Sequence, residues 1–169
     1  CLLLMLVGIL GCDGLLTLIN TPEEVFARID EAAHYAETGI QVMPINTMFQ
    51  LYARKKENEA WLREARHLLF MPDLFAYYRT GVPGNEYCIA STSELLDARR
   101  RTWNMPLIRE LGLPEHLFGE LLEPGTVRGT LCPEVAAEVG LSPGVKVVAV
   151  GSHDTASAVH AVPFRKGKE

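Results

Sequence analysis

The chain has 169 residues, of which 48% are hydrophobic and 22% are charged, and its formal net charge at pH 7 is −5. This length predicts about one domain, and the composition is that of a folded globular protein rather than a disordered segment. The acidic balance argues against nucleic-acid binding, because that function requires clustered Lys and Arg. Two short basic runs, at residues 54–56 and 99–101, are interpreted as solvated faces.

Cysteine usage favours a reducing setting. The four cysteines, at positions 1, 12, 88 and 132, lack the CxxC spacing and the Cys/His clustering of zinc sites. Irregular spacing in a chain of this size favours the cytoplasm over a disulfide-dense secreted scaffold, with a single disulfide bridge left open as an alternative.

Residues 1–20 are considered separately, because nearly all of them are apolar. No Lys or Arg precedes Arg28, so the segment lacks the basic start of a signal peptide. Gly11, Asp13 and Gly14 interrupt the run of about 20 apolar residues that a transmembrane helix needs, so a membrane anchor is not favoured. We interpret the segment as core without its partners or as sequence foreign to the domain, which is expected at residues 21–169.

The first predicted element is an amphipathic helix at residues 22–37. Thr21, Pro22 and Glu24 form a helix start, because Thr21 can accept a hydrogen bond from the amide three residues on while Glu24 reaches back. Apolar residues then recur at helical spacing, and Gly39 suits the end of the helix.

The middle of the chain is predicted to be mainly helical. The pattern of apolar residues, Gly and Pro predicts helices at residues 47–56, 58–66, 73–80 and 103–111. Residues 86–96 are instead rich in β-formers and small polar residues, which predicts a strand that passes into a turn.

Strands and helices alternate in the last third, which predicts the α/β class. The expected elements are a strand at 127–131, a helix at 133–139, a strand at 145–150 and a helix at 155–161. The strand at 145–150 is nearly all apolar, as expected of a central strand covered on both faces, and the helix after it is expected to pack closely on the sheet.

The best candidate for chemistry is the 151–154 turn, Gly151-Ser152-His153-Asp154, which leaves that strand. Ligands of open α/β sheets bind at the carboxyl edge of the strands, and the start of the next helix offers free amides and a positive dipole end. An ionised Asp154 at this position could accept a proton from a substrate hydroxyl, as a kinase of small alcohols requires.

Each of these residues also has an ordinary structural interpretation. Asp154 taken alone is better explained as a helix N-cap, and His153 as a packing residue. A hydrolase triad of Ser152, His153 and Asp154 is rejected, because consecutive side chains diverge. A metal site built from His153, Asp154 and His160 is weakly supported, and no Walker or GxGxxG phosphate loop is present.

The 151–159 segment, Gly-Ser-His-Asp-Thr-Ala-Ser-Ala-Val, resembles the catalytic segment of the FGGY carbohydrate kinases, and of their rhamnulokinase branch in particular. The upstream stretches similar to that branch are 38–41, 46–47, 50–51, 68–75, 80–81, 86–87, 90–93, 95–97, Trp103, 124–125 and Gly129. The order and spacing hold from about residue 22 to residue 163, most of the chain.

The resemblance implies part of a ribonuclease-H-like, actin-like ATPase domain with a helix-rich middle and a mixed sheet. It implies ATP and magnesium as cofactors, a small-molecule sugar as partner, and transfer of the γ-phosphoryl group to the 1-hydroxyl of L-rhamnulose. The match to the family's motif implies that Asp154 is the proton acceptor and that His153 and Thr155 help to hold the sugar.

The chain also departs from the family, whose members are more than twice as long. The phosphate-binding hairpin and the second domain that carries most of the adenine site are missing. We therefore expect a fragment with little or no kinase activity of its own. The alternatives are another FGGY kinase, for L-fuculose, xylulose or glycerol, and a non-catalytic remnant. The sequence does not indicate an oligomeric state.

Overall fold

The structure is a computed structural model that describes residues 3–5, 21–163 and 167. The described helices are α2 (Glu31–Thr38), α3 (Thr47–Glu57), α4 (Glu59–Glu64), α5 (Met71–Thr80), α6 (Tyr87–Ser91), α7 (Met105–Glu110), α8 (Pro133–Glu138) and α9 (Asp154–Ala161), with a 3-10 turn η1 (Glu115–Leu117). Residues 21–26 are also helical. Apart from residues 3–5, the apolar segment 1–20 lies outside the described residues.

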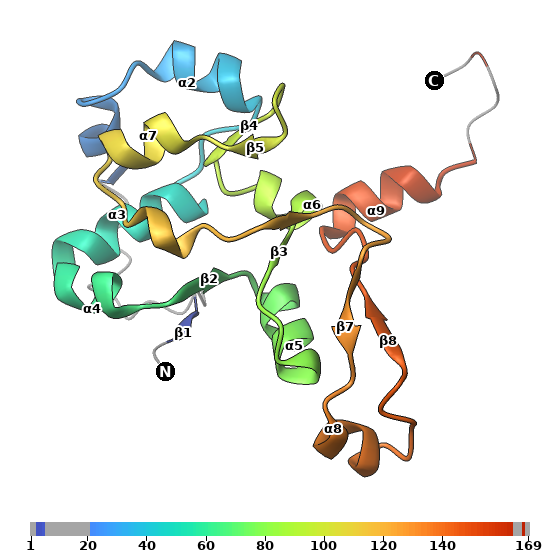
Figure 1. Ribbon diagram of the computed structural model, residues 1–169. Helices are drawn as coiled ribbons and strands as arrows, with labels where there is room; N and C mark the ends of the chain where they lie inside the picture. Colours follow the sequence, from blue (N-terminus) through green and yellow to red (C-terminus); the bar gives the residue numbers. More distant parts are fainter. Residues whose placement is uncertain (1–2, 6–20, 164–166, 168–169) are drawn as a thin grey trace.

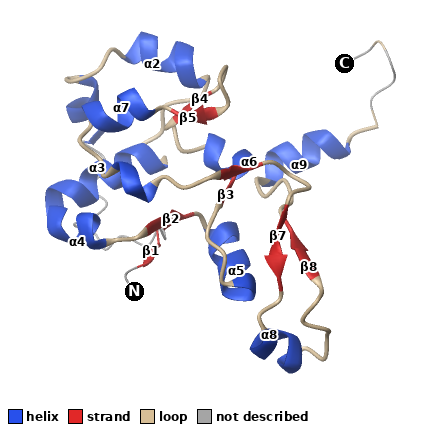
Figure 2. Ribbon diagram, viewed as in Figure 1, coloured by secondary structure: helices blue, strands red, loops and turns tan. Residues whose placement is uncertain are grey.

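The strands are short and pair two by two (Figure 2). They are β1 (Leu3–Met5), β2 (His67–Leu69), β3 (Asn85–Glu86), β4 (Leu96–Asp97), β5 (Thr102–Trp103), β6 (Leu121–Leu122), β7 (Val127–Thr130) and β8 (Lys146–Val148). The pairs β1–β2 and β3–β6 are parallel, whereas β4–β5 and β7–β8 are antiparallel. The predicted α/β class is confirmed. Among the described residues, the strands form these small pairs.

Two regions differ in packing, and Figure 1 shows them on opposite sides of the molecule. The helical region, residues 21–122, holds the buried apolar cluster, whose members lie between Val25 and Leu117. The carboxyl-terminal arm, residues 123–163, consists of the β7–β8 pair with α8 at its tip, followed by α9. The buried side chains of the arm are those of Arg128, Leu131, Ala136 and Ala149.

Several predicted elements are confirmed to within a few residues. Helices α3, α4, α5, α7 and α8 and strand β7 lie where the sequence places them. The predicted glycine stops are also present, because Gly39 and Gly81 take left-handed φ values of 66° and 72° at the ends of α2 and α5.

The single helix predicted at residues 22–37 is wrong. The helix that includes residues 21–26 ends, and α2 starts afresh at Glu31. Asp30 causes the new start, because its backbone is extended and its carboxylate accepts a 2.6 Å hydrogen bond from the Ala33 amide. The helical spacing of the apolar residues continues through this point, so the spacing alone does not reveal the second N-cap.

The strand predicted at residues 86–96 is also wrong for most of its length. Strand β3 ends at Glu86, and helix α6 begins at the next residue. The Glu86 carboxylate accepts hydrogen bonds from the amides of Cys88 at 2.6 Å and Ile89 at 3.1 Å. This side-chain cap outweighs the β-propensity of the residues that follow it.

The burial expected of residues 145–161 is not found. Val148 is 44% exposed and Val150 is 66% exposed, so the strand is not covered on both faces. Among the described residues, β8 pairs with β7 alone, which leaves its other edge without a strand. Helix α9 has no buried residue and does not pack closely on a sheet.

Candidate active site

Asp154 is the first residue of α9, directly after the 151–154 turn. The N-cap position belongs to His153, whose side chain makes no capping hydrogen bond, so the interpretation of Asp154 as the N-cap is wrong. The Asp154 carboxylate accepts a 2.7 Å hydrogen bond from the Thr155 amide, and its side chain is 96% exposed. A carboxylate held at one oxygen by its neighbour leaves the other free to meet a reactant.

His153 lies beside this carboxylate and faces a cavity. Its Nε2 atom is 3.7 Å from Asp154 Oδ1, and its side chain is 35% exposed. The cavity has a volume of about 430 Å³ and is lined, besides His153, by Ile40, Met43, Ile45, Asn46, Thr47 and Thr92. We call it the His153 cavity. Amide and hydroxyl groups next to apolar side chains suit a small polyhydroxylated ligand.

Thr155 is the third predicted site residue, and its placement is more peripheral. It is exposed, and its hydroxyl lies 3.4 Å from Asp154 Oδ1. The structure therefore brings His153, Asp154 and Thr155 together at one helix start, with His153 alone among them lining the cavity.

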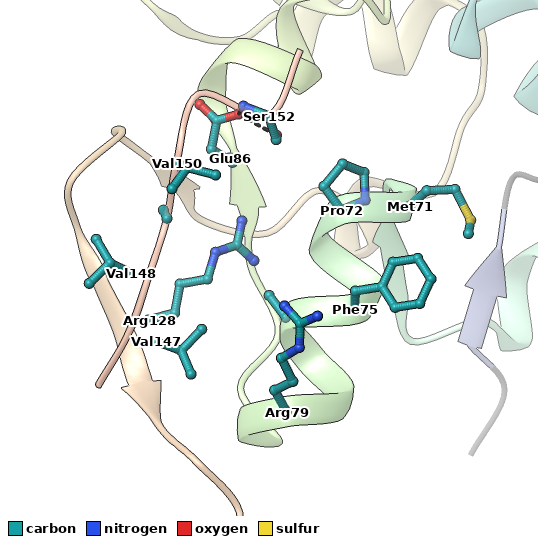
Figure 3. A pocket seen from close by; sticks show the side chains of 12 residues that line it. Met71, Pro72, Phe75, Arg79, Glu86, Arg128, Val147, Val148, Val150 and Ser152 are labelled. Carbon is teal, nitrogen blue, oxygen red and sulfur yellow. Dashed lines mark hydrogen bonds between the residues drawn. The ribbon is translucent and has the colours of Figure 1, made fainter. Parts of the chain in front are cut away.

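The turn is tied to the helical region through Ser152 and Glu86. Glu86 Oε2 accepts a 3.1 Å hydrogen bond from the Ser152 amide and a 2.6 Å hydrogen bond from the Ser152 hydroxyl. Glu86 is 1% exposed, and Figure 3 shows it meeting Ser152 at one end of a groove between α5 and the β7–β8 pair. The Ser152 hydroxyl points to Glu86, which agrees with the rejection of the hydrolase triad.

A buried ion pair lies next to Glu86. The guanidinium of Arg128, on β7, donates to the Asp73 carboxylate of α5, and their side chains are 4% and 0% exposed. Asp73 also accepts a 3.0 Å hydrogen bond from the Glu86 amide. Burial raises the pKa of the Asp73 carboxyl above its ordinary value, while hydrogen bonds from Arg128, Glu86 and Asn85 act in the opposite direction.

Sequence reasoning missed Glu86 and the Asp73–Arg128 pair as parts of the site's support. Glu86 belongs to a stretch that resembles the kinase family, but that resemblance assigned it no role. Its partner Ser152 is 66 residues away in the chain, so no local pattern connects the two. A buried carboxylate surrounded by donors becomes visible only in three dimensions.

The described residues do not assemble a metal site. No group of three or more His, Cys, Asp or Glu side chains among them is arranged to hold a metal ion. His153 lines the cavity beside α3, whereas His160 lines a different one of about 390 Å³ together with Cys88 and Pro124. Within the described part of the chain, no helix is both long and apolar enough to cross a membrane.

Comparison with known sequences gives a consistent family. Residues 19–160 match the profile of the N-terminal domain of the FGGY family of carbohydrate kinases. The chain is 42% identical over 145 residues to "Rhamnulokinase" of Bacteroides thetaiotaomicron and 40% identical over 141 residues to "Rhamnulokinase" of Oceanobacillus iheyensis. These matches cover 86% and 83% of this chain but 30% of each relative, so the chain spans about 30% of the length of the curated relatives it matches.

Solved structures agree on the fold. A xylulose kinase from Rhodospirillum rubrum superposes with a TM-score of 0.77 at 22% identity, over 88% of this chain and 30% of that one. A carbohydrate kinase from Novosphingobium aromaticivorans gives a TM-score of 0.66 at 26% identity, over 83% of this chain and 30% of that one. The small sheets and helices described above therefore follow the N-terminal part of a sugar-kinase fold.

Proposed function

Because this chain belongs to the FGGY family of carbohydrate kinases, we propose that it forms the sugar-binding side of an enzyme that phosphorylates L-rhamnulose. The reaction is transfer of the γ-phosphoryl group of ATP to the 1-hydroxyl, which yields L-rhamnulose 1-phosphate for L-rhamnose breakdown in the cytoplasm. The observation that carries the proposal is the position of Asp154 beside His153, whose side chain lines the His153 cavity.

The sugar is proposed to occupy the His153 cavity. Asn46, Thr47 and Thr92 supply polar groups at its wall, and Ile40, Met43 and Ile45 supply apolar contact. The groove between α5 and the β7–β8 pair is the weaker candidate, because neither His153 nor Asp154 lines it. A sugar needs hydrogen-bond partners for its hydroxyl groups, and in the His153 cavity these include His153, the neighbour of the proposed base.

Asp154 is proposed to be the general base. Its exposed carboxylate takes the proton of the 1-hydroxyl as that oxygen bonds to the γ-phosphorus, and the bond between this phosphorus and ADP breaks. His153 and Thr155 orient the sugar from either side of the base. Positioning of this kind accounts for much of the rate in phosphoryl transfer, because little covalent chemistry is left to the protein.

ATP use follows from the family, and a divalent metal such as magnesium is expected with it. The described residues do not fit either group well, since they include neither a glycine-rich phosphate loop nor a metal-binding cluster. We assign no residue of this chain to ATP or to magnesium. We therefore expect the 169-residue chain by itself to bind ATP poorly and to turn over little sugar.

Other FGGY substrates are the nearest alternative. L-Fuculose, xylulose and glycerol remain candidates, and of these xylulose is named in a solved kinase of this fold. Relatives called "Rhamnulokinase" at 37–42% identity favour L-rhamnulose. A non-catalytic remnant is the alternative of a different class.

The test is an assay of ADP release by the chain extended at both ends along its gene to the length of its relatives. L-Rhamnulose, L-fuculose, xylulose and glycerol are compared as acceptors, and Asp154→Asn is compared with wild type. Loss of a general base is expected to lower kcat by about 100-fold to 10,000-fold. Glu31→Gln, which changes an exposed carboxylate in the first turn of α2, is the matched control and is expected to keep full activity.

The outcomes separate the alternatives. Fastest turnover of L-rhamnulose, lost in Asp154→Asn, supports both the substrate and the base. Turnover of another sugar corrects the substrate but keeps the base. If the extended wild type phosphorylates no sugar, the non-catalytic alternative replaces the proposal, and an Asp154→Asn variant as fast as wild type removes Asp154 from the mechanism.

A further inference from the structure

We propose that Glu86 is a positioning residue that holds the 151–154 turn, so that His153 and Asp154 face the sugar in one orientation. This inference rests on the proposed function for its catalytic consequence. The geometry that suggests it, two hydrogen bonds from Ser152 to one buried carboxylate, does not depend on that function.

Four donors converge on the Glu86 carboxylate. Oε1 accepts from the Cys88 amide at 2.6 Å, and Oε2 accepts from the Ile89 amide at 3.1 Å. Ser152 adds its amide at 3.1 Å and its hydroxyl at 2.6 Å, both to Oε2. The first two bonds start α6, so Glu86 joins the beginning of one helix to the turn that begins another.

Glu86 itself is held firmly. It is the last residue of β3, where Leu122 of β6 is its partner in the parallel pair. Its amide donates a 3.0 Å hydrogen bond to the buried Asp73 carboxylate. With 1% of its surface exposed, the side chain has little freedom to move away from Ser152. Because this acceptor is fixed, hydrogen bonds to it hold the turn in place relative to the helical region.

The turn has few other means of being fixed. Among the described residues, the two bonds from Ser152 are the hydrogen bonds that join residues 151–163 to a distant part of the chain. The bond from Ser157 to the Gly151 carbonyl is internal to the segment, and α9 buries no side chain. The orientation of Asp154, two residues after Ser152, therefore depends strongly on Glu86.

Two substitutions probe this link from opposite ends. Glu86→Gln keeps the size of the side chain but replaces one acceptor oxygen with an NH₂ group, which must face a donor on either α6 or Ser152. Ser152→Ala removes the hydroxyl bond and leaves the start of α6 untouched. Ser152→Thr restores a hydroxyl, and Ser142→Ala is the matched control in an exposed turn of the arm.

The first measurement is amide hydrogen exchange of residues 151–153 in the 169-residue chain. We expect exchange to become about tenfold faster in Glu86→Gln, because a hydrogen bond to a carboxylate is lost or weakened, and to be unchanged in Ser142→Ala. Equal exchange in wild type and Glu86→Gln would overturn the proposal, whatever the outcome of the kinase assay.

The second measurement is the steady-state kinetics of the extended chain. In Ser152→Ala, kcat is expected to fall on the order of 10-fold to 100-fold with KM for ATP unchanged, and Ser152→Thr is expected to recover most of the loss. Equal kcat in the Ala and Thr variants would refute a positioning role. If the extended wild type is inactive toward every sugar, the proposed function fails, and the exchange rates alone decide whether Glu86 holds the turn.

Discussion

The helical region and the carboxyl-terminal arm differ in how many side chains they bury and in whether they carry the candidate catalytic residues. The helical region holds the apolar cluster from Val25 to Leu117, whereas the arm carries His153 and Asp154 and buries few side chains. The polar contacts between the regions include the buried Arg128–Asp73 ion pair and the hydrogen bonds between Ser152 and Glu86. The candidate site therefore lies on the less packed part of the chain, and its proposed anchor, Glu86, lies in the better packed part.

This division suggests that stability and activity can be changed separately. Residues deep in the helical region should govern the free energy of unfolding, because it depends on buried apolar area and on filled space. His153 and Asp154 should govern the reaction and leave the free energy of unfolding nearly unchanged. The links between the regions should affect both.

The largest effect on stability is expected from Phe49→Ala. Phe49 is 0% exposed in α3 and packs edge-on against Phe26, with ring centroids 5.8 Å apart. Its truncation should lower the free energy of unfolding by about 4 kcal/mol, because a cavity replaces a large buried ring. Urea unfolding followed by circular dichroism measures the change.

Val150→Ala is the corresponding truncation of an exposed apolar residue in the arm. Val150 is 66% exposed, so its change in the free energy of unfolding should stay within about 0.5 kcal/mol. Comparable losses in the two variants would mean that the arm is packed as tightly as the helical region, and the contrast between the regions would disappear.

The contrast also explains which parts of the fold could be predicted from sequence. Helix α3 and the glycine stop at Gly39 depend on nearby residues, and both were predicted. The break before Glu31 and the start of α6 depend on Asp30 and Glu86 acting as caps, which override the surrounding pattern. Sequence patterns predicted the elements that depend on nearby residues alone. They failed where the cap formed by one side chain overrides the surrounding pattern.

The strand at 145–150 illustrates a different failure. Its apolar sequence is typical of a covered central strand, yet Val148 and Val150 are exposed. An apolar pattern of this kind is typical of a strand that neighbouring elements cover, but the described part of this chain supplies β8 with one neighbouring strand. Apolar composition thus predicted the element but not the partners that would cover it.

The site was predicted in part. The sequence and its family resemblance placed Asp154 after a strand at a helix start, as the structure has it. The roles of Asp154, His153 and Thr155 stay predictions until activity is measured. The support from Glu86 was not foreseen, because Glu86 and Ser152 are 66 residues apart in sequence and the family resemblance assigned neither of them a role.

A smaller loss is expected from Arg128→Met, which breaks the buried link between β7 and α5. The substitution leaves the Asp73 carboxylate buried without its charged partner, which should cost about 3 kcal/mol. Arg63→Met is the control, since the Arg63–Glu59 pair within α4 is 68% and 48% exposed and is expected to contribute at most about 1 kcal/mol. Urea midpoints of the two variants give the comparison, and equal midpoints would show that the buried link does not anchor the arm.

The smallest effect is a pH dependence of that same loss. Burial raises the pKa of the Asp73 carboxyl, so the folded chain binds this proton more tightly than the unfolded chain. The contribution of this group to stability is therefore greatest below the ordinary carboxyl pKa of about 4 and falls as the pH rises through the folded-state value. Arg128 opposes the rise in pKa, so its removal should extend this fall to higher pH.

The stability difference between wild type and Arg128→Met should consequently be small at acid pH and should grow toward neutral pH. Urea unfolding of both proteins at about pH 4.5 and about pH 7.5 measures it, and taking the difference cancels the titration of groups that the two proteins share. A protonated Asp73 does not need the guanidinium, whereas an ionised one does. A difference that is the same at both pH values would mean that charge on Asp73 is not what holds β7 to α5, and that the arm is anchored by packing of the Arg128 side chain instead.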